Sequence, residues 1–362
     1  MPDAARPPIR SPEDPAFLDL CHALAQGADE VDASGKWPAE QLRICGQRGV
    51  WSWFLPFDWQ GDEWSEPDLA RGYMGLAGAC LTTTFIITQR IAAVRRILAS
   101  SNDALKAQLL PGLRTGERSA TVGLSQLTTS HQHTDEPVLR AEETTGGYKL
   151  NGFSPWVTGA AHADTIVVGA VLGDGRELLI ALPTNRPGVS VDPPLRLLGV
   201  SASATGQVRL ANVEVSEELV LAGPVHGVLT GGGGGSGAGG LQTSSLAIGL
   251  AGAAIDYLDQ ESVQRPNLVA VAAGLRVDQT QIEADLLNLA EGEPVCTQDE
   301  LRTRANSLAL RASQAALGAA KGAGYVWGHR TGRYCREALF FLVWSCPHPV
   351  MQANLCELAG LE

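Results

Sequence analysis

Residues 147–159 read Gly-Tyr-Lys-Leu-Asn-Gly-Phe-Ser-Pro-Trp-Val-Thr-Gly, and they say more about the fold than any other stretch of the chain. They join a strand-and-turn pattern to an aromatic residue and a hydroxyl residue two positions apart. Residues two apart on a strand point to the same face, so Trp156 and Thr158 are expected to line one wall together. For an isolated pair of this kind, the alternative is a core tryptophan beside a β-forming threonine.

An indole beside a hydroxyl suits a flat heterocycle with polar edges, such as a flavin. The face of Trp156 would stack on the ring system, and the Thr158 hydroxyl would reach a ring nitrogen. The pair therefore predicts a cofactor wall at the end of this strand.

The composition is that of a globular protein with a large core. The chain has 362 residues, of which 44% are hydrophobic and 18% are charged, so it is long enough for two or three domains. Acidic residues outnumber basic ones and give a formal net charge of −12, and the sequence has no basic patch with interleaved aromatic residues. Both features argue against a nucleic-acid-binding surface.

The cysteines and the N-terminal residues favour a reducing compartment. The seven cysteines are scattered without a C-x-x-C pair, and an odd number fits reduced thiols better than a disulfide framework. Residues 1–15 are rich in proline and charge, so we expect neither a signal peptide nor an anchor. The apolar run 246–254 is shorter than the roughly 20 residues that span a bilayer. The sequence predicts a cytoplasmic protein with no membrane insertion and no metal site.

Hydrophobic periodicity divides the chain into helical and strand-like parts. Apolar residues recur at helical spacing from Phe17 to Leu24, and a long helical segment is expected over residues 67–98. Within it, the threonine-rich and β-branched run 81–88 favours a helix less than its neighbours do. Short alternating stretches separated by Gly, Pro and Asn occupy residues 119–222 and predict an antiparallel sheet or a small barrel.

A run of glycine and other small residues over 231–240 follows, and such a run cannot form a stable element by itself. Helical periodicity resumes at Leu241. Thr297 and Glu300 form a capping box for a helix that is expected to close near Gly322. We therefore expect an α-helical domain, a β-domain, a linker and a second α-helical domain, with these limits: 1–118, 119–223, 224–240 and 241–362.

Several stretches occur together in a recognisable order: Leu109–Leu113, Thr121–Gln126, residues 146–170 and residues 188–215. This succession resembles the acyl-CoA dehydrogenase family, over nearly the whole chain. In that family the central β-domain begins with a Leu-Thr-Glu-Pro turn and later carries a Leu-Asn-Gly-x-Lys-x-Trp-Ile-Thr-Asn segment. The resemblance implies an α+β fold: an N-terminal α-helical domain, a central antiparallel β-domain and a C-terminal domain like a four-helix bundle. It also implies FAD, bound between the β-domain and the C-terminal helices.

The resemblance further implies which residues bind the cofactor. The family's turn falls on Leu124, Ser125 and Gln126, where Ser125 keeps a hydroxyl for the flavin pyrimidine edge and Gln126 replaces a glutamate. Trp156 and Thr158 match the family's tryptophan and threonine.

Three further cofactor segments match less closely. The glycine-rich turn that approaches the pyrophosphate in the family is Thr128-Thr129-Ser130-His131 here, and a solvated loop is the alternative. An arginine with which a second subunit holds the adenine half falls on Arg265, where a solvated charge at a helix end is the alternative. The family's Gly-Gly-x-Gly-Tyr segment falls on Gly322, Gly324 and Tyr325.

The position of the family's catalytic base falls on Ser345, within Trp344-Ser345-Cys346, where most members have Tyr-Glu-Gly. Dehydrogenation of an acyl-CoA needs a group that is basic near neutral pH, such as a carboxylate with a raised pKa. A serine hydroxyl does not supply this unaided. A second position used by some members falls near Gly239, where there is no carboxylate either.

Two consequences stay open. Either another residue takes over proton transfer, with His348, His329 and Glu337 as candidates, or the reaction is not α,β-dehydrogenation. A packed histidine is the alternative to a catalytic one. We expect Cys346 to be a buried structural thiol.

Three functions therefore remain. The first is an FAD-dependent oxidoreductase acting on an acyl-CoA or a related extended substrate. The second is a flavin-dependent monooxygenase on the same fold, and the third is an inactive family member with a structural or interaction role. The resemblance also implies a homodimer or homotetramer, because family members associate through their C-terminal helices.

Overall fold

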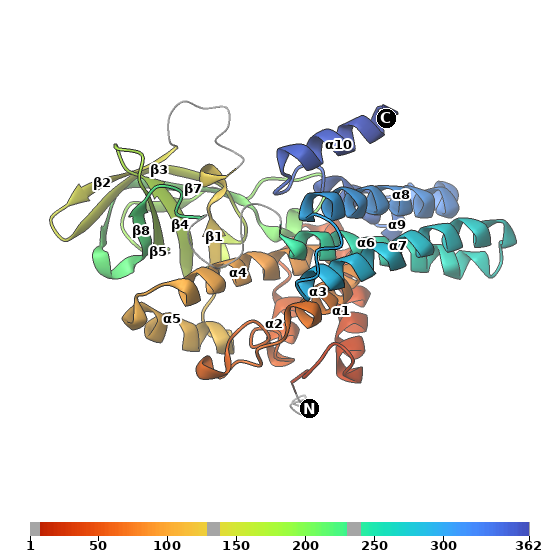
Figure 1. Cartoon of the computed structure of the whole chain (residues 1–362), viewed down its shortest axis with the longest axis horizontal. Helices are drawn as coiled ribbons and strands as arrows, with labels where there is room; N and C mark the ends of the chain where they lie inside the picture. Colours follow the sequence, from red (N-terminus) through yellow and green to blue (C-terminus); the bar gives the residue numbers. More distant parts are fainter. Residues whose placement is uncertain (1–7, 129–137, 230–239, 362) are drawn as a thin grey trace.

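The structure, a computed structural model, describes residues 8–128, 138–229 and 240–361. The sheet lies at one end of the molecule, and long helices of the C-terminal part extend to the other end (Figure 1). The N-terminal helices lie below both of them in this view. The expected pyrophosphate loop at 129–131 and the position Gly239 lie outside the described residues.

The N-terminal part is helical, as expected. Side chains cap two of its helices: Asp14 accepts a hydrogen bond from the backbone of Ala16, and Ser65 accepts one from the backbone of Asp68. Its helices are α1 (Pro15–Ser34), α2 (Ala39–Gln47), α3 (Glu66–Ala79), α4 (Leu81–Ala99) and α5 (Asp103–Thr115).

The expected single helix over 67–98 is wrong, because α3 ends and α4 begins at Cys80. Cys80 has extended backbone angles, φ −154° and ψ 101°, so the helix is interrupted there. The threonine-rich run is nevertheless helical. Thr84 and Thr88 are buried, and their hydroxyls donate to the carbonyls of Cys80 and Phe85, so both hydroxyls are paired inside the helix region.

The central part is one sheet in which antiparallel pairs predominate. The strand order is β6-β7-β3-β2-β4-β5-β8, and β1 also pairs with β4. Its strands are β1 (Ala120–Gly123), β2 (Leu139–Thr144), β3 (Gly147–Val157), β4 (Thr165–Val171), β5 (Glu177–Pro183), β6 (Val189–Val191), β7 (Gly206–Ser216) and β8 (Val220–Val225).

Two pairings in this sheet, β1 with β4 and β2 with β4, are parallel, so the sheet is mixed. Alternation of apolar and polar residues does not encode the direction of a strand's partner, and a parallel pair needs a long connection that periodicity does not reveal. The antiparallel expectation holds for the other pairs.

The C-terminal part is again helical. The capping box is present, since the Thr297 hydroxyl accepts from the backbone of Glu300 and the Glu300 carboxylate accepts from the backbone of Thr297. The helix it opens ends at Gly324, after a kink at Lys321. The helices are α6 (Leu241–Ser262), α7 (Val269–Ala290), α8 (Gln298–Gly324), α9 (Arg330–Phe340) and α10 (His348–Leu358).

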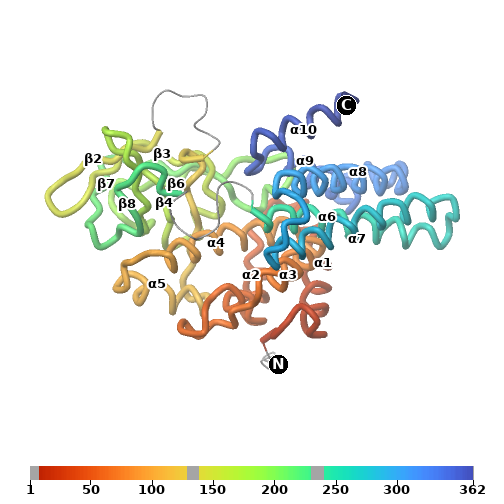
Figure 2. The backbone as a smooth tube through the Cα atoms, in the orientation of Figure 1, coloured from red at the N-terminus to blue at the C-terminus, as the bar shows by residue number. Residues whose placement is uncertain are grey.

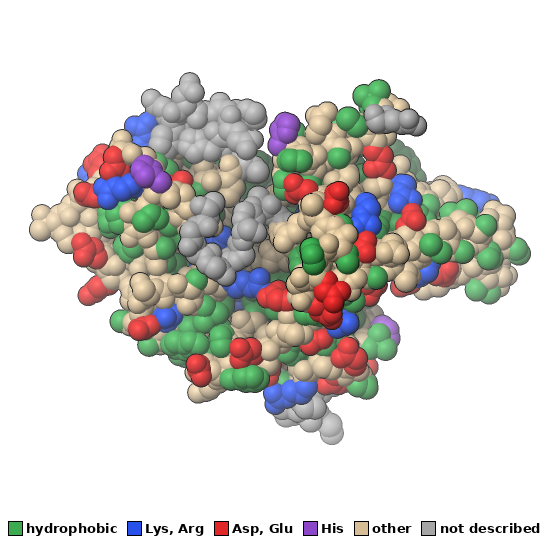
Figure 3. Space-filling model, in the orientation of Figure 1, with side chains coloured by type: hydrophobic (Ala, Val, Ile, Leu, Met, Phe, Trp, Pro, Cys, Tyr) green, Lys and Arg blue, Asp and Glu red, His purple; other side chains and the backbone are tan. Residues whose placement is uncertain are grey.

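The backbone trace shows α6, α7 and α8 running side by side away from the sheet (Figure 2). No helix among the described residues is long and apolar enough to cross a lipid bilayer. On the face seen in Figure 3, acidic and basic side chains are interspersed over the sheet end and the helical end alike.

Helix α4 belongs to two hydrophobic cores and so joins the two halves of the fold. Its first half packs with the N-terminal and C-terminal helices, as with Leu81 and Leu250. Its second half packs with the sheet, as with Ile97 and Val167. Burial of apolar side chains along both halves of α4 stabilises this junction. The large cavity of the molecule lies along the same helix.

Candidate functional site

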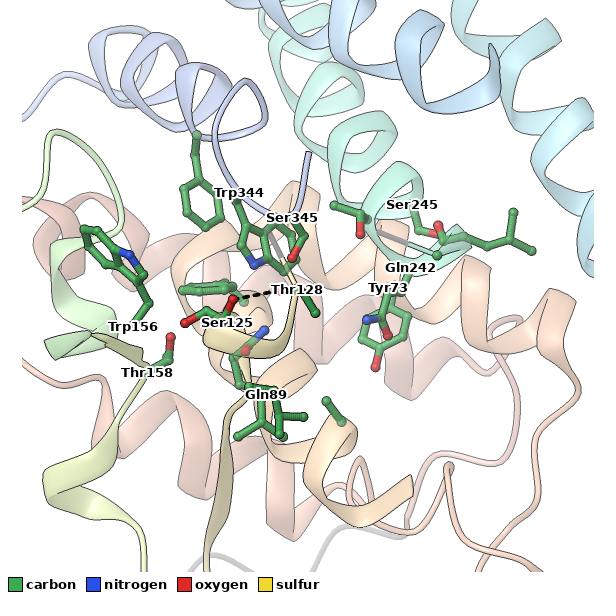
Figure 4. A pocket seen from close by; sticks show the side chains of 18 of the residues that line it. Tyr73, Gln89, Ser125, Thr128, Trp156, Thr158, Gln242, Ser245, Trp344 and Ser345 are labelled. Carbon is green, nitrogen blue, oxygen red and sulfur yellow. Dashed lines mark hydrogen bonds between the residues drawn. The ribbon is translucent and has the colours of Figure 1, made fainter. Parts of the chain in front are cut away.

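One cavity of about 1490 Å³ lies where the sheet, the N-terminal helices and the C-terminal helices meet. It is lined by faces of α3 and α4, the ends of β1 and β3, the start of α6 and the segment that follows α9. In the close view, Trp156, Thr158 and Ser125 lie on one side, Tyr73 and Gln242 on the other, and Trp344 and Ser345 above them (Figure 4).

The structure brings the two residues of the opening stretch to this cavity. Trp156 lies at the end of β3 and is 50% exposed, whereas Thr158 directly after the strand is 3% exposed. Both line the cavity. The indole can therefore be covered by a ligand without any change to the core.

The Thr158 hydroxyl belongs to a chain of three buried hydroxyls. Its oxygen lies 2.9 Å from that of Thr205, which lies 2.8 Å from that of Ser203. Each hydroxyl donates one hydrogen bond and accepts up to two. If Ser203 donates to Thr205 and Thr205 donates to Thr158, the proton of Thr158 remains available for a ligand in the cavity.

Ser125 and Leu124 also line the cavity, just after β1. The Ser125 hydroxyl oxygen is buried and has no hydrogen-bond partner among the described residues. A buried hydroxyl without a partner costs free energy unless a ligand supplies one. Gln126 does not line the cavity: its amide donates to the carbonyls of Gly123 and Gly169, so it fixes the turn that carries Ser125.

Ser345 lines the cavity from the segment after α9, with a positive φ of 42°. Its neighbour Trp344 stacks on Phe340, with ring centroids 5.0 Å apart, and meets Phe85 of α4 edge-on at 4.9 Å. The wall beside Ser345 is therefore aromatic. Glu66 is the single carboxylate among the described lining residues, and it forms an ion pair of 3.2 Å with Arg95.

The candidate replacements for the base lie outside this lining. His348 is exposed at the start of α10, and His329 caps α9, where its Nδ1 lies 2.9 Å from the Thr331 hydroxyl. Glu337 is 1% exposed and accepts a hydrogen bond of 3.1 Å from Arg333, and burial raises its pKa to about 7. Cys346 is half-buried, and burial raises the pKa of its thiol, which disfavours a nucleophilic thiolate.

Arg265 and Gly322, the two other expected cofactor residues, are not brought to the cavity of the same chain. Arg265 donates to the Glu261 carboxylate at 3.1 Å and to the Ala319 carbonyl at 2.5 Å, so it ties the loop after α6 to α8. Gly322 lies in the last turn of α8, and an added Cβ there would meet open space.

Several lining residues escape sequence reasoning because they belong to helices that look like ordinary core. Phe85, Gln89, Ala92 and Arg96 follow one another at helical spacing on α4 and share the cavity face. The pattern that could have indicated this cavity face is the presence of Gln89 and Arg96 on a helix face that is otherwise apolar.

Comparison with known proteins finds similarity to an acyl-CoA dehydrogenase and to the oxygenase component of a hydroxylase. A probable acyl-CoA dehydrogenase, YngJ, of Bacillus subtilis (strain 168) is 26% identical over 248 residues, or 64% of this chain and 62% of that protein. The oxygenase component of p-hydroxyphenylacetate 3-hydroxylase of Acinetobacter baumannii is 24% identical over 54% of this chain and 43% of that protein. The chain thus spans less than two thirds of the length of these relatives. No protein-family model matches the chain.

Solved structures share the fold over nearly the full length. The butyryl-CoA dehydrogenase of Megasphaera elsdenii superposes with a TM-score of 0.81 at 19% identity, over 95% of this chain and 97% of that one. The glutaryl-coenzyme A dehydrogenase in its glutaryl-CoA complex superposes with a TM-score of 0.79 at 18% identity, over 96% of each chain. The arrangement of helices, sheet and helices is that of these proteins.

Proposed function

Because the chain is a member of the acyl-CoA dehydrogenase family, we propose that it is an oxidoreductase that binds FAD in the cavity described above. The observation that carries this proposal is the convergence of Trp156, Thr158 and Ser125 on one cavity from two separate strand ends. The substrate class that fits best is an acyl-CoA or a related extended molecule.

The lining suits a flavin. The volume of about 1490 Å³ exceeds the roughly 300–1,000 Å³ of an ordinary small-molecule pocket, so a cofactor and a substrate have room together. The unpartnered hydroxyl of Ser125 and the hydroxyl of Thr158 would hold polar edges of the ring system, and the Trp156 indole would cover one face. A bound flavin supplies the capacity to accept a hydride or an electron pair.

The residues of the chain bind and orient, but they offer no strong base beside Ser345. The one carboxylate among the described lining residues, Glu66, already forms an ion pair with Arg95. The aromatic side chains of Phe85, Phe340 and Trp344 pack together beside the segment that carries Ser345 and add no basic group to it. We therefore propose that the protein oxidises straight-chain acyl-CoAs slowly or not at all.

A flavin-dependent monooxygenase is the second candidate function. It is favoured by the lack of an unpaired carboxylate among the described lining residues, because a hydroxylation in which a bound reduced flavin and oxygen would supply the chemistry needs no protein base for an α-proton. The similarity to a hydroxylase oxygenase component supports the same reading.

We further propose a cytoplasmic homodimer or homotetramer. On α10, Met351, Leu355 and Leu358 are spaced as one helix face and are 37%, 52% and 57% exposed. An apolar face of this kind gains stability when a second copy covers it.

The visible absorbance spectrum of the purified protein, before and after FAD is added, tests the proposal directly. We expect a bound-flavin spectrum, and a protein that shows none and gains none contradicts it. Anaerobic bleaching by an acyl-CoA would identify a dehydrogenase. Oxygen uptake that depends on both reduced flavin and substrate would identify the monooxygenase, and a structural protein would show neither.

A further inference from the structure

The cavity is positively charged although the chain is strongly acidic. The formal net charge of the chain is −12. The charged residues among the described cavity lining are Arg95, Arg96, Arg336 and Glu66, so positive charges outnumber negative ones three to one. Arg336 already forms an ion pair with Asp32 outside the lining. Arg95 forms an ion pair with Glu66, so the positive charge that is not balanced in the described lining is that of Arg96, directly beside Arg95.

The two arginines lie at the other end of the α4 face from the aromatic wall. Phe85, which meets Trp344 edge-on, and Arg96 are separated by about 16 Å along the helix at 1.5 Å per residue. An extended ligand can thus contact the aromatic wall near Ser345 and the arginines at the same time.

Each arginine makes one hydrogen bond that the structure records, so most of its N–H donors are left for a ligand. The Nε of Arg96 is buried without a partner among the described residues, and its Nη1 donates at 3.3 Å to the carbonyl of Ala92 in its own helix. Arg95 shares a single contact of 3.2 Å with Glu66, whose side chain is 62% exposed. Burial, and then the adjacent charge of Arg95, lower the pKa of Arg96. A bound anion would relieve both effects.

Tyr73 adds a neutral donor on the facing helix. It lies two turns after Glu66 on the face of α3 that lines the cavity, and it is 3% exposed. Its hydroxyl is buried with no partner among the described residues. Burial raises the pKa of Tyr73 far above its usual value, so the hydroxyl keeps its proton and remains a donor.

We propose that Arg95 and Arg96, with Tyr73, form a subsite for an anionic oxygen group of the substrate, either a carboxylate or a phosphate. The proposal rests on the proposed function in that it takes the same cavity to hold the substrate. A planar guanidinium matches both oxyanions through two parallel hydrogen bonds. The substrate is then an extended molecule with a negative group remote from its reacting end.

Calorimetric binding of three probes to the full chain supplied with FAD tests this subsite. The first probe is coenzyme A, which carries phosphates. The second is an N-acetylcysteamine thioester of a dicarboxylic acid, which carries one carboxylate and no phosphate, and the third is the neutral methyl ester of the second. The variants are Arg96→Gln, Arg96→Lys and Arg71→Gln. Arg71 is the matched control, because it forms an ion pair of 3.2 Å with Asp68 on α3 outside the cavity lining.

We expect Arg96→Gln to weaken binding of at least one charged probe about tenfold or more, since a hydrogen bond to a charged group is lost. Arg96→Lys should retain part of the affinity, and Arg71→Gln and the neutral ester should show no such change. If Arg96→Gln loses affinity for coenzyme A alone, the subsite binds a phosphate. If it loses affinity for the dicarboxylic thioester alone, the subsite binds a carboxylate. Equal affinities of wild type and Arg96→Gln for both charged probes, or no binding of either probe to the wild type, overturn the subsite.

The two proposals fail in different ways. A sample that shows no flavin absorbance but binds a charged probe through Arg96 contradicts the proposed function and keeps the subsite. A sample that binds FAD but shows no dependence on Arg96 contradicts the subsite alone. Thermal unfolding of each variant identifies a loss of binding that comes from misfolding.

Discussion

The hydroxyl oxygens of Thr158 and Thr205 lie 2.9 Å apart, and both residues are buried in the lining of the same cavity. Thr205 is held from the other side by Ser203 at 2.8 Å. Ser203 is flanked by two residues with positive φ, Val200 at 54° and Ala204 at 50°, so an unusual backbone path places this hydroxyl. The orientation of the Thr158 hydroxyl is therefore set by a loop of the sheet and not by Thr158 alone.

Replacing Thr205 with valine tests this orientation. The change keeps the shape of the side chain but removes both hydrogen bonds of the Thr205 hydroxyl, one to Thr158 and one to Ser203. The bond that orients Thr158 has a net contribution of about 0.5–1.5 kcal/mol, so FAD affinity should fall roughly two- to tenfold. Fluorescence titration with FAD measures it. Thr84→Val is the control, because the Thr84 hydroxyl is also buried but bonds to the Cys80 carbonyl away from the cavity. A similar loss in the control would mean that the effect is not local.

Because the Trp156 indole is half exposed, a substitution there can change FAD binding with little effect on the stability of the fold. It is 50% exposed, so Trp156→Ala should leave the melting temperature nearly unchanged. Loss of stacking on an aromatic heterocycle costs about 1–3 kcal/mol, which corresponds to a roughly 5- to 150-fold loss of FAD affinity. Trp156→Phe should retain most of the affinity. Equal FAD affinity of the alanine variant and the wild type would exclude stacking on this side chain.

The end of β3 was predictable because the strand and the two cavity residues are close in sequence. The register shift between Ser154 and Val157 interrupts the simple alternation that the prediction assumed. The break at Cys80 was not predictable, since α3 and α4 are both apolar and the interruption between them leaves no signal in the hydrophobic pattern. Arg95 and Arg96 were missed for the same reason, because an arginine near a helix end has a simple explanation in the helix dipole. The cavity exists only once α3, α6 and the sheet are assembled around α4.

The buried carboxyl of Glu337 should make the stability depend on pH in an unusual direction. Burial raises its pKa from 4.5 to about 7, so between these values the folded chain holds a proton that the unfolded chain has released. Its contribution is complete below pH 4.5 and is lost as the pH rises towards 7, by up to about 3 kcal/mol. Urea unfolding of wild type and Glu337→Gln across this range measures the difference. The exposed residue Glu293 supplies the control variant Glu293→Gln, and a constant difference between wild type and Glu337→Gln would contradict the raised pKa.

Ser345 is the position where a single carboxylate would change the chemistry. It lines the cavity beside an aromatic wall, and a carboxylate placed there would be partly desolvated, which raises its pKa towards the range of a useful base. We expect Ser345→Glu, loaded with FAD, to bleach anaerobically with a straight-chain acyl-CoA at least about a hundredfold faster than the wild type, because general base catalysis contributes roughly 10²–10⁴.

The matched control is Ser345→Gln, which has nearly the same size and must adopt the same positive φ of 42° but cannot accept the proton. It should bleach no faster than the wild type. If both variants bleach at the same rate, the gain comes from the shape of the side chain and not from a base. If the wild type already bleaches as fast as Ser345→Glu, a base outside the described lining serves the reaction, and Ser345 does not limit it.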